Sequence, residues 1–300
     1  MILRNIDYLI PISQSKDPMS FKEIYGDKSD CRFEGFLCLS GCNLNSLEGC
    51  PAEVIGSFSC SENLLENLIG GPKKVSGVYY CNNNKLLKSL EGVATYIGDT
   101  LECSSCVLEN LDFFPQEVEG RVNCSHNKLS TLGGLPQIIN GNFNCSENPD
   151  LISLTGGPKL VKGDYNCSCC SLTSLNGVAE EILGSFLCNS NQIKSLELAP
   201  KSVNYLLHCG DNDLEDLNWL FTSGIEKFNC CGNNFSDYRS LGPILTLNIK
   251  NNIDGISNIE ADINILRKRE EIMDLSEKIK RIAVKLNYDN FKIQRALSLL

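Results

Sequence analysis

One residue type recurs along this 300-residue chain at a nearly constant interval, and that interval constrains the fold more than any other feature. Ten cysteines follow one another at spacings of 21 or 22 residues: Cys38, Cys60, Cys81, Cys103, Cys124, Cys145, Cys167, Cys188, Cys209 and Cys230. A period in the twenties is typical of a solenoid, in which each repeat is one coil stacked on the previous coil. Equivalent positions of successive repeats therefore have to be compared with one another.

The residues around each cysteine predict a short strand with one buried face. An apolar residue stands two positions before each cysteine: Phe36, Phe58, Tyr79, Leu101, Val122, Phe143, Tyr165, Phe186, Leu207 and Phe228. Apolar residues two apart, separated by mostly polar ones, are typical of a half-buried strand. Three positions after the cysteine, most repeats have asparagine: Asn63, Asn84, Asn127, Asn148, Asn191, Asn212 and Asn233. Cys106 and Cys170 take that position in two repeats, and Cys42 takes it in the first with a one-residue slip.

These positions resemble the leucine-rich repeat, whose core is L-x-L-x-x-N/C-x-L-x-x-L. In the second repeat, Phe58, Cys60, Asn63, Leu65 and Leu68 occupy those places. The S-L-x-G-x-P pattern, to which the ends of the repeats conform fully or in part, is similar to a subclass found in bacterial and bacteriophage proteins. The resemblance implies an α/β repeat solenoid, with short parallel strands on one face, a turn-rich convex side and helices at the C-terminal end.

The resemblance covers residues 33–256, which are predicted to form ten coils or eleven. The eleventh would be a degraded repeat at Leu247-x-Ile249-x-x-Asn252. The repeats depart from the consensus in one respect: the apolar residue before the strand usually lies six positions before the cysteine, where the consensus has five. A glycine commonly stands between, as Gly77 and Gly120 do. We interpret this spacing as a longer or bulged start of the strand.

An open solenoid exposes its core at both ends, so both ends need a cap. Residues 1–32 are predicted to form the N-terminal cap. Within them Ser20 and Glu23 have the spacing of a capping box, which predicts a short helix ending near Gly26.

Residues 257–300 are predicted to be helical, because apolar residues recur there at intervals of three and four. The stripe consists of Ile272, Leu275, Ile279, Ile282 and Leu286. Two interpretations remain open for this segment. It is either a helical cap on the last coil, or a hairpin that binds a partner, including a second copy of the chain in a homodimer.

The cysteines themselves predict packing, with no metal and no cofactor. The pairs Cys103/Cys106 and Cys167/Cys170 have the CxxC spacing of zinc ligands, but three coils separate them, or roughly 14 Å at the strand spacing. Zinc–sulfur bonds are about 2.3 Å long, so one ion cannot reach both pairs. Stacked side chains are also too far apart for a disulfide, which brings Cβ atoms to about 3.8 Å. We expect reduced thiols and a cytoplasmic protein, in the host cytoplasm if a phage encodes it.

Composition excludes several classes of function. The chain has a formal charge of −10, which argues against binding the phosphates of nucleic acid. No stretch approaches 18 consecutive apolar residues, so we expect no membrane span. The two histidines, His126 and His208, are four coils apart, and no triad, phosphate loop or paired-carboxylate motif is present. We therefore expect no enzyme.

The outward strand positions, one and three residues before each cysteine, are the predicted binding surface. They form a concave strip rich in Asn and Ser, interrupted by apolar side chains around Tyr80 and Val78 and around Leu187 and Leu206. The candidate partner-binding residues are Tyr80, Arg121, Asn123, Asn144, Asn166, Leu187, Leu206 and His208. A solvated strip with no partner is the alternative for these residues.

The predicted function is noncatalytic binding of a protein along this strip. The subclass resemblance suggests a phage- or bacterium-encoded inhibitor of a host or defence protein. The alternative is a structural or assembly protein that oligomerises through its C-terminal helices.

Overall fold

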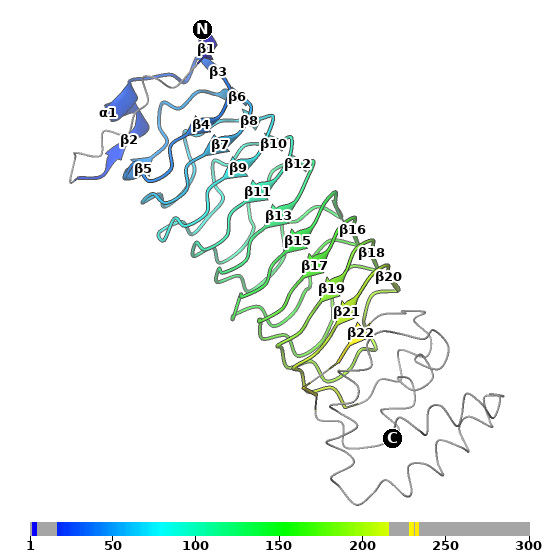
Figure 1. Ribbon diagram of the computed structural model, residues 1–300. Helices are drawn as coiled ribbons and strands as arrows, with labels where there is room; N and C mark the ends of the chain where they lie inside the picture. The colour runs from blue at the N-terminus through cyan, green and yellow to red at the C-terminus, as the bar shows by residue number, and fades with distance from the viewer. Residues whose placement is uncertain (1, 5–16, 216–227, 231, 234–300) are drawn as a thin grey trace, which may run out of the picture.

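The computed structural model describes residues 2–4, 17–215, 228–230 and 232–233. The chain winds into coils that stack along one axis, with the strands of successive coils side by side and parallel (Figure 1). Each repeat contributes two residues to a ten-stranded sheet, at the predicted place in every repeat but the first. Its strands are β4 (Leu37–Cys38), β7 (Phe58–Ser59), β9 (Tyr79–Tyr80), β11 (Leu101–Glu102), β13 (Val122–Asn123), β15 (Phe143–Asn144), β17 (Tyr165–Asn166), β19 (Phe186–Leu187), β21 (Leu207–His208) and β22 (Phe228–Asn229). The described chain is thus a parallel β-solenoid that resembles leucine-rich-repeat proteins.

A second row of short strands precedes the first, and it corrects the prediction of one longer or bulged strand. Six strands form one parallel sheet: β1 (Ile2–Arg4), β3 (Arg32–Glu34), β6 (Glu53–Ile55), β8 (Lys74–Val75), β10 (Tyr96–Ile97) and β12 (Glu117–Val118). Four more form another: β14 (Ile138–Ile139), β16 (Leu160–Val161), β18 (Glu181–Ile182) and β20 (Ser202–Val203). A bend at the repeated glycine separates the two rows. A Cβ at Gly98 would lie 2.3 Å from the carbonyl oxygen of Ser76 in the previous coil, so the bend requires glycine.

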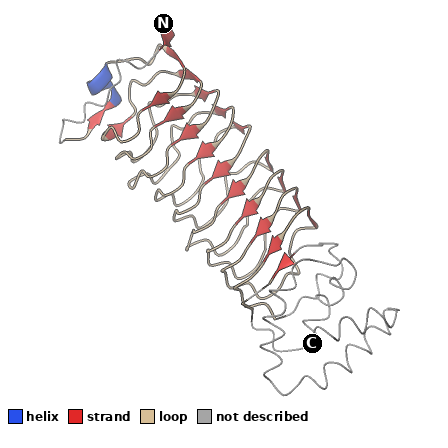
Figure 2. Ribbon diagram, viewed as in Figure 1, coloured by secondary structure: helices blue, strands red, loops and turns tan. Residues whose placement is uncertain are grey.

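The α/β class is not supported by the described residues. Their one helix is α1 (Phe21–Tyr25), and the return side of the coils consists of turns and loops, as Figure 2 shows. The capping box that predicted this helix is confirmed, because the Glu23 amide donates to Ser20 Oγ and the Ser20 amide donates to the Glu23 carboxylate. Beside α1, β2 (Met19–Ser20) pairs with β5 (Leu44–Ser46). The eleventh coil and the C-terminal helices lie outside the described residues, and the domain boundaries remain predictions.

The first coil is shifted by one residue from the predicted alignment. Leu37 pairs with Phe58 and Cys38 with Ser59, so Leu39 takes the place of the core cysteine. Leu37 and Leu39 are fully buried, whereas Phe36 is 51% exposed and Cys38 is also exposed. Cys42 then falls in the asparagine position without any slip.

The inward side chains of all the described coils form one continuous core. The position two before the cysteine stacks aromatic rings: Phe143 lies 5.0 Å from Tyr165, and Tyr165 lies 5.6 Å from Phe186, between ring centroids. The nine core cysteines from Cys60 onward are buried, and several thiols donate to a carbonyl of the next coil, as Cys103 Sγ does to Asn123 at 3.3 Å. Burial raises the pKa of the Cys188 thiol to about 12, which keeps it protonated and unreactive.

The asparagines beside the core cysteines hydrogen-bond backbone groups on two coils. Asn148 Nδ2 donates to the carbonyls of Cys124 and Cys145, and its Oδ1 accepts from the Leu129 amide of the previous coil. A buried backbone group without a partner is costly, so this side chain replaces contacts that water would otherwise make.

Coil length explains why two repeats have cysteine in this position. Each of these two repeats follows a 22-residue coil, in which the extra residue closes a turn of its own. The Leu87 amide donates to the Asn84 carbonyl before Cys106, and the Leu151 amide donates to the Asn148 carbonyl before Cys170. The Leu87 and Leu151 amides are then no longer available to donate to an asparagine oxygen in the next coil. A thiol is enough to donate to the previous coil, as Cys106 Sγ does to the Cys81 carbonyl at 3.4 Å.

The return turns of seven coils share a residue with positive φ. Six of these residues are glycines, and the seventh is Phe113 with φ 65°. The glycines are Gly49, Gly70, Gly92, Gly134, Gly156 and Gly177. Phe113 is also 61% exposed, so a bulky side chain is held in a strained conformation without burial to offset it.

Candidate functional site

The outward side of the ten-stranded sheet, here called the sheet face, carries all the described candidate residues. Strand pairing aligns Asn123 with Asn144, Asn144 with Asn166, Asn166 with Leu187 and Leu187 with His208. These five residues therefore form a single row across adjacent coils. The predicted row is confirmed, while the binding role of its members remains a proposal.

An apolar patch lies at the C-terminal end of this row. Leu187 and His208 are strand partners, and Leu206 stands two residues before His208 on the same side of the strand. All three are partly exposed, so the patch presents apolar surface without being part of the core. Burial lowers the pKa of His208, although Asp211 opposes the shift, so the ring is neutral at pH 7.

An aromatic patch lies at the N-terminal end of the sheet face. The ring of Phe36 lies 6.4 Å from the ring of Tyr80, measured between centroids, and Val78 precedes Tyr80 by two residues. Phe36 was missed as a site residue because the predicted alignment placed it in the core. The alternative alignment, Leu37-x-Leu39-x-x-Cys42, was the signal that could have identified it.

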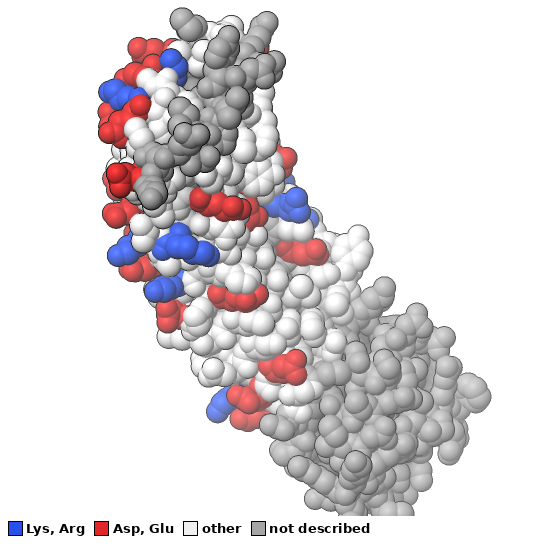
Figure 3. All heavy atoms as spheres, turned by 60° about the vertical axis from the view of Figure 1, so that its left-hand side comes forward, with Lys and Arg blue, Asp and Glu red and all other residues white. Residues whose placement is uncertain are grey.

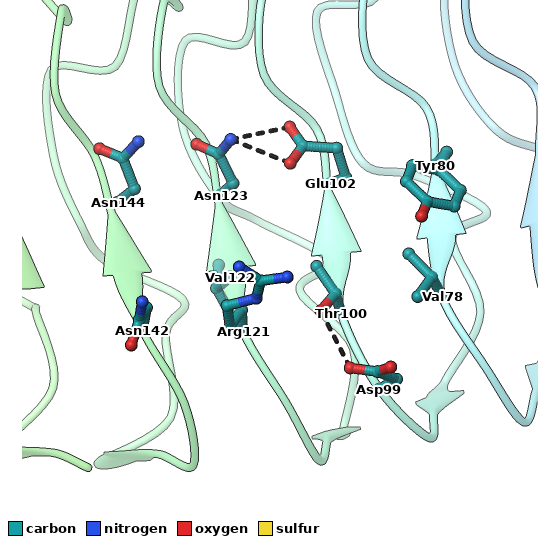
Figure 4. A pocket seen from close by; sticks show the side chains of 10 residues that line it. All are labelled: Val78, Tyr80, Asp99, Thr100, Glu102, Arg121, Val122, Asn123, Asn142 and Asn144. Atoms are coloured by element: carbon teal, nitrogen blue, oxygen red, sulfur yellow. Dashed lines mark hydrogen bonds between the residues drawn. The ribbon is translucent and has the colours of Figure 1, made fainter. Parts of the chain in front are cut away.

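A shallow pocket of about 280 Å³ opens on the sheet face, starting at Val78 and Tyr80 of the aromatic patch and extending toward the apolar patch. Figure 4 shows its lining, which comes from four adjacent coils. The lining residues are Val78, Tyr80, Asp99, Thr100, Glu102, Arg121, Val122, Asn123, Asn142 and Asn144. Four of the predicted candidates meet in this pocket: Tyr80, Arg121, Asn123 and Asn144. The structure adds polar residues beside them that the prediction did not single out.

Glu102 and Asn123 form the central contact of the pocket. Asn123 Nδ2 lies 2.9 Å from both carboxylate oxygens of Glu102, on neighbouring coils. The amide of Ser104 also donates to Glu102, at 3.3 Å. Beside them, Thr100 Oγ1 donates to Asp99 at 3.0 Å. Both carboxylates are therefore hydrogen-bonded to neutral groups.

The described residues contain no group of three or more His, Cys, Asp or Glu side chains placed to hold a metal ion. No helix of the described residues is long and apolar enough to cross a membrane. Between residues 17 and 215 there are 25 Asp and Glu against 13 Lys and Arg. Figure 3 shows these charges dispersed in small groups over the face in view, with wide uncharged areas between them. No continuous basic strip that would suit a phosphate backbone is seen there.

The remaining candidates divide into two groups. Asn166 lies on the sheet face beyond the pocket, between Asn144 and Leu187. The candidate helix interface lies outside the described residues; it consists of Ile272, Leu275, Ile279, Ile282 and Leu286. Cys169, which follows the strand of its coil, is exposed.

Comparisons with known proteins add little to this picture. No protein-family model matches the chain, and no curated protein sequence is significantly similar to it. Among solved structures, YopM from Yersinia enterocolitica WA-314 matches with 18% identity and a TM-score of 0.36, over 62% of this chain. The match spans 48% of the length of that protein, about half. At this distance the similarity does not bear on what either protein binds.

Proposed function

We propose that the chain is a noncatalytic binding protein whose sheet face docks onto another protein. The observation that carries this proposal is the arrangement on that face: two partly exposed apolar patches flank a hydrogen-bonding pocket. Apolar anchors surrounded by polar groups are typical of protein interfaces. The short strands of this face are hydrogen-bonded side by side in one sheet, so such a surface loses little conformational entropy on binding.

Within this role, the S-L-x-G-x-P endings suggest the repeat subclass of bacterial and bacteriophage proteins. On that analogy we propose an inhibitor of a host or defence protein, encoded by a phage or a bacterium. Apart from Cys209 and Cys230, the described cysteines are free thiols, which suits a reducing compartment such as the cytoplasm. This part of the proposal rests on resemblance and composition, and no pocket feature requires it.

The alternative role is an assembly protein that oligomerises through its C-terminal helices. It depends on the stripe from Ile272 to Leu286, which lies outside the described residues. Light scattering coupled to size exclusion would test it directly: a stable oligomer that dissociates when Leu275 and Ile282 are replaced by Ser would favour assembly.

The protein-binding role is tested by affinity purification from lysate of the source organism or its host, with mass spectrometry to identify the captured protein. The wild-type chain is compared with the double variant Leu187→Ser, Leu206→Ser. Both side chains lie on the sheet face outside the core, so the variant should keep its far-ultraviolet circular dichroism and lose the partner.

Leu198→Ser provides the matched control. Leu198 is 54% exposed and belongs to a return turn, away from the sheet face. Loss of the partner in the sheet-face variant, with retention in the Leu198 variant, supports the proposal. Equal retention in both would show that the C-terminal apolar patch is not part of the interface.

A further inference from the structure

Backbone amides fix the orientation of three asparagines on the sheet face. The side-chain oxygen of each faces a backbone N–H, and its Nδ2 group points away from that N–H. Asn142 Oδ1 accepts from the Asp164 amide at 3.0 Å. Asn144 Oδ1 accepts from the Ser146 amide at 3.1 Å, and Asn166 Oδ1 accepts from Ser168 in the same way. An N–H can only donate, so the side-chain oxygen must face it and the Nδ2 group must face the other way. None of these Nδ2 groups has a hydrogen-bond acceptor among the described residues.

Arg121 completes a group of donors with Asn142 and Asn144. Arg121 and Asn142 occupy the same position in neighbouring coils, and all three residues line the pocket (Figure 4). We call Arg121, Asn142 and Asn144 the donor cluster. The guanidinium of Arg121 is exposed and has no ion pair or hydrogen bond to any residue in the described part of the chain.

An unpaired arginine is unexpected in a region with almost twice as many acidic as basic residues. The structure explains it locally. The two carboxylates that line the same pocket bond to neutral groups and not to Arg121: Glu102 accepts from Asn123 Nδ2 through both oxygens, and Asp99 accepts from Thr100. The pocket thus keeps a cation and two amide donors free of internal acceptors.

We infer that the donor cluster binds the carboxylate of an acidic side chain, Asp or Glu, on the partner protein. This inference rests on the proposed function and specifies which chemical group of the partner enters the pocket. A guanidinium offers parallel N–H donors that match a carboxylate in a two-point contact, and the two amides can donate to its outer lone pairs.

The surrounding charge favours a tethered carboxylate over a free anion. The described solenoid is strongly acidic, so its electrostatic field weakens the binding of a free anion without preventing it. A carboxylate that belongs to a partner is brought to the cluster by the other contacts of the interface, including the apolar patches. The acidic side chain would then add selectivity by excluding partners with a basic residue at that place.

The test uses a defined probe and needs no knowledge of the partner. N-acetyl-glutamate α-methylamide is titrated at constant ionic strength and pH 7 into the isotope-labelled full chain. The side-chain resonances of Arg121, Asn142 and Asn144 are followed by nuclear magnetic resonance. The neutral analogue N-acetyl-glutamine α-methylamide and free acetate are titrated in parallel.

We expect saturable shifts at these three side chains with the glutamate probe, and binding about fivefold weaker with the glutamine analogue, as for a single exposed ion pair. The variants Arg121→Gln and Asn142→Asp should lose the response. Asn142→Asp retains an oxygen to accept from the Asp164 amide, so it should remain folded. Asn140→Asp, an exposed change in the same coil that does not line the pocket, should retain the response.

Three outcomes would overturn the inference. Equal binding of the glutamine analogue would show that charge is not recognised. An undiminished response in Asn142→Asp would place the carboxylate elsewhere. No saturable shift of these side chains with either the glutamate probe or acetate would show that the donor cluster does not bind a carboxylate. None of these outcomes bears on the Leu187 and Leu206 patch, so the proposed function stands or fails separately.

Discussion

The asparagine position of the repeat supports a sharp prediction about stability, because the same position contains cysteine in two coils. Asn148 makes contacts on three sides: it donates to the carbonyls of Cys124, Cys145 and Ser146 at 2.9 to 3.2 Å, and accepts from the Leu129 amide at 3.0 Å. Asn148→Ala removes all of them and leaves a buried N–H and buried carbonyls without partners. Each orphaned group costs about 1–3 kcal/mol, so we expect a loss of about 3–5 kcal/mol.

Cys170→Ala is the matched comparison, one coil further along. Its thiol makes two weak contacts, to the Cys145 carbonyl at 3.4 Å and to the Ser168 carbonyl at 3.6 Å. The Leu151 amide, which would donate to an asparagine at position 170, already donates to the Asn148 carbonyl within its own coil. No N–H is orphaned, so we expect a loss of about 1 kcal/mol.

Urea unfolding followed by circular dichroism measures both variants, with the change in midpoint taken at an unchanged slope. The informative quantity is the difference between them, expected at about 2 kcal/mol or more. Equal losses in Asn148→Ala and Cys170→Ala would refute the idea that coil length decides which residue the position needs. Asn148→Cys extends the test: the thiol can restore a contact to the Cys124 carbonyl but cannot accept well from the Leu129 amide, so it should recover only part of the loss.

Three further predictions follow from other parts of the molecule. Phe113→Gly should stabilise the chain by about 1 kcal/mol in the same urea assay, because it relieves a positive φ of 65° in an exposed turn; a destabilised variant would contradict the strain. In native protein labelled with iodoacetamide and mapped by mass spectrometry, Cys38 and Cys169 should react before Cys188, whose pKa of about 12 and full burial protect it; simultaneous labelling would count against the buried column. His208 has a folded-state pKa below 6.5, so the unfolded chain binds its proton more readily. Its contribution to stability is therefore present above pH 6.5 and is lost as the pH falls, and this loss should be absent in His208→Gln; an imidazole pKa above 6.5 by nuclear magnetic resonance would contradict it.

Several structural features could be predicted because each depends on residues close together in the chain. The interval between cysteines sets the length of a coil, and the alternation of apolar and polar residues selects the inward side of each strand. The capping box of α1 involves Ser20 and Glu23, three residues apart. In the same way, the row from Asn123 to His208 follows from counting equivalent positions in successive coils.

The errors arise where two local patterns compete. In the first coil, both Phe36-x-Cys38 and Leu37-x-Leu39 satisfy the apolar alternation. A shift by one residue exchanges the two faces of the strand, so the choice decides which side chains are buried. The neighbouring coil makes the choice, since pairing with Phe58 places Leu37 inward. As a result an aromatic side chain, Phe36, moves from the predicted core to the candidate binding face.

The candidate site shows the same division. Its residue types could be read column by column, including Tyr80, Arg121 and the asparagines. Which of these side chains lack a hydrogen-bond partner could not be predicted, because that depends on which side chains bond to each other across coils. Only the folded chain shows that Glu102 accepts from Asn123 and that Arg121 has no side-chain partner among the described residues.

The amino-acid sequence by itself determined that this protein is a stack of coils of 21 or 22 residues and which positions of most coils face inward, because the repeat length and the two-residue alternation are local properties. The tertiary structure alone decided the alignment of the first coil, the bend that divides each coil into two strands, and the set of polar groups left free on the sheet face. Those features result from contacts between residues about twenty positions apart, whose backbone and side-chain groups meet only when one coil lies on the next.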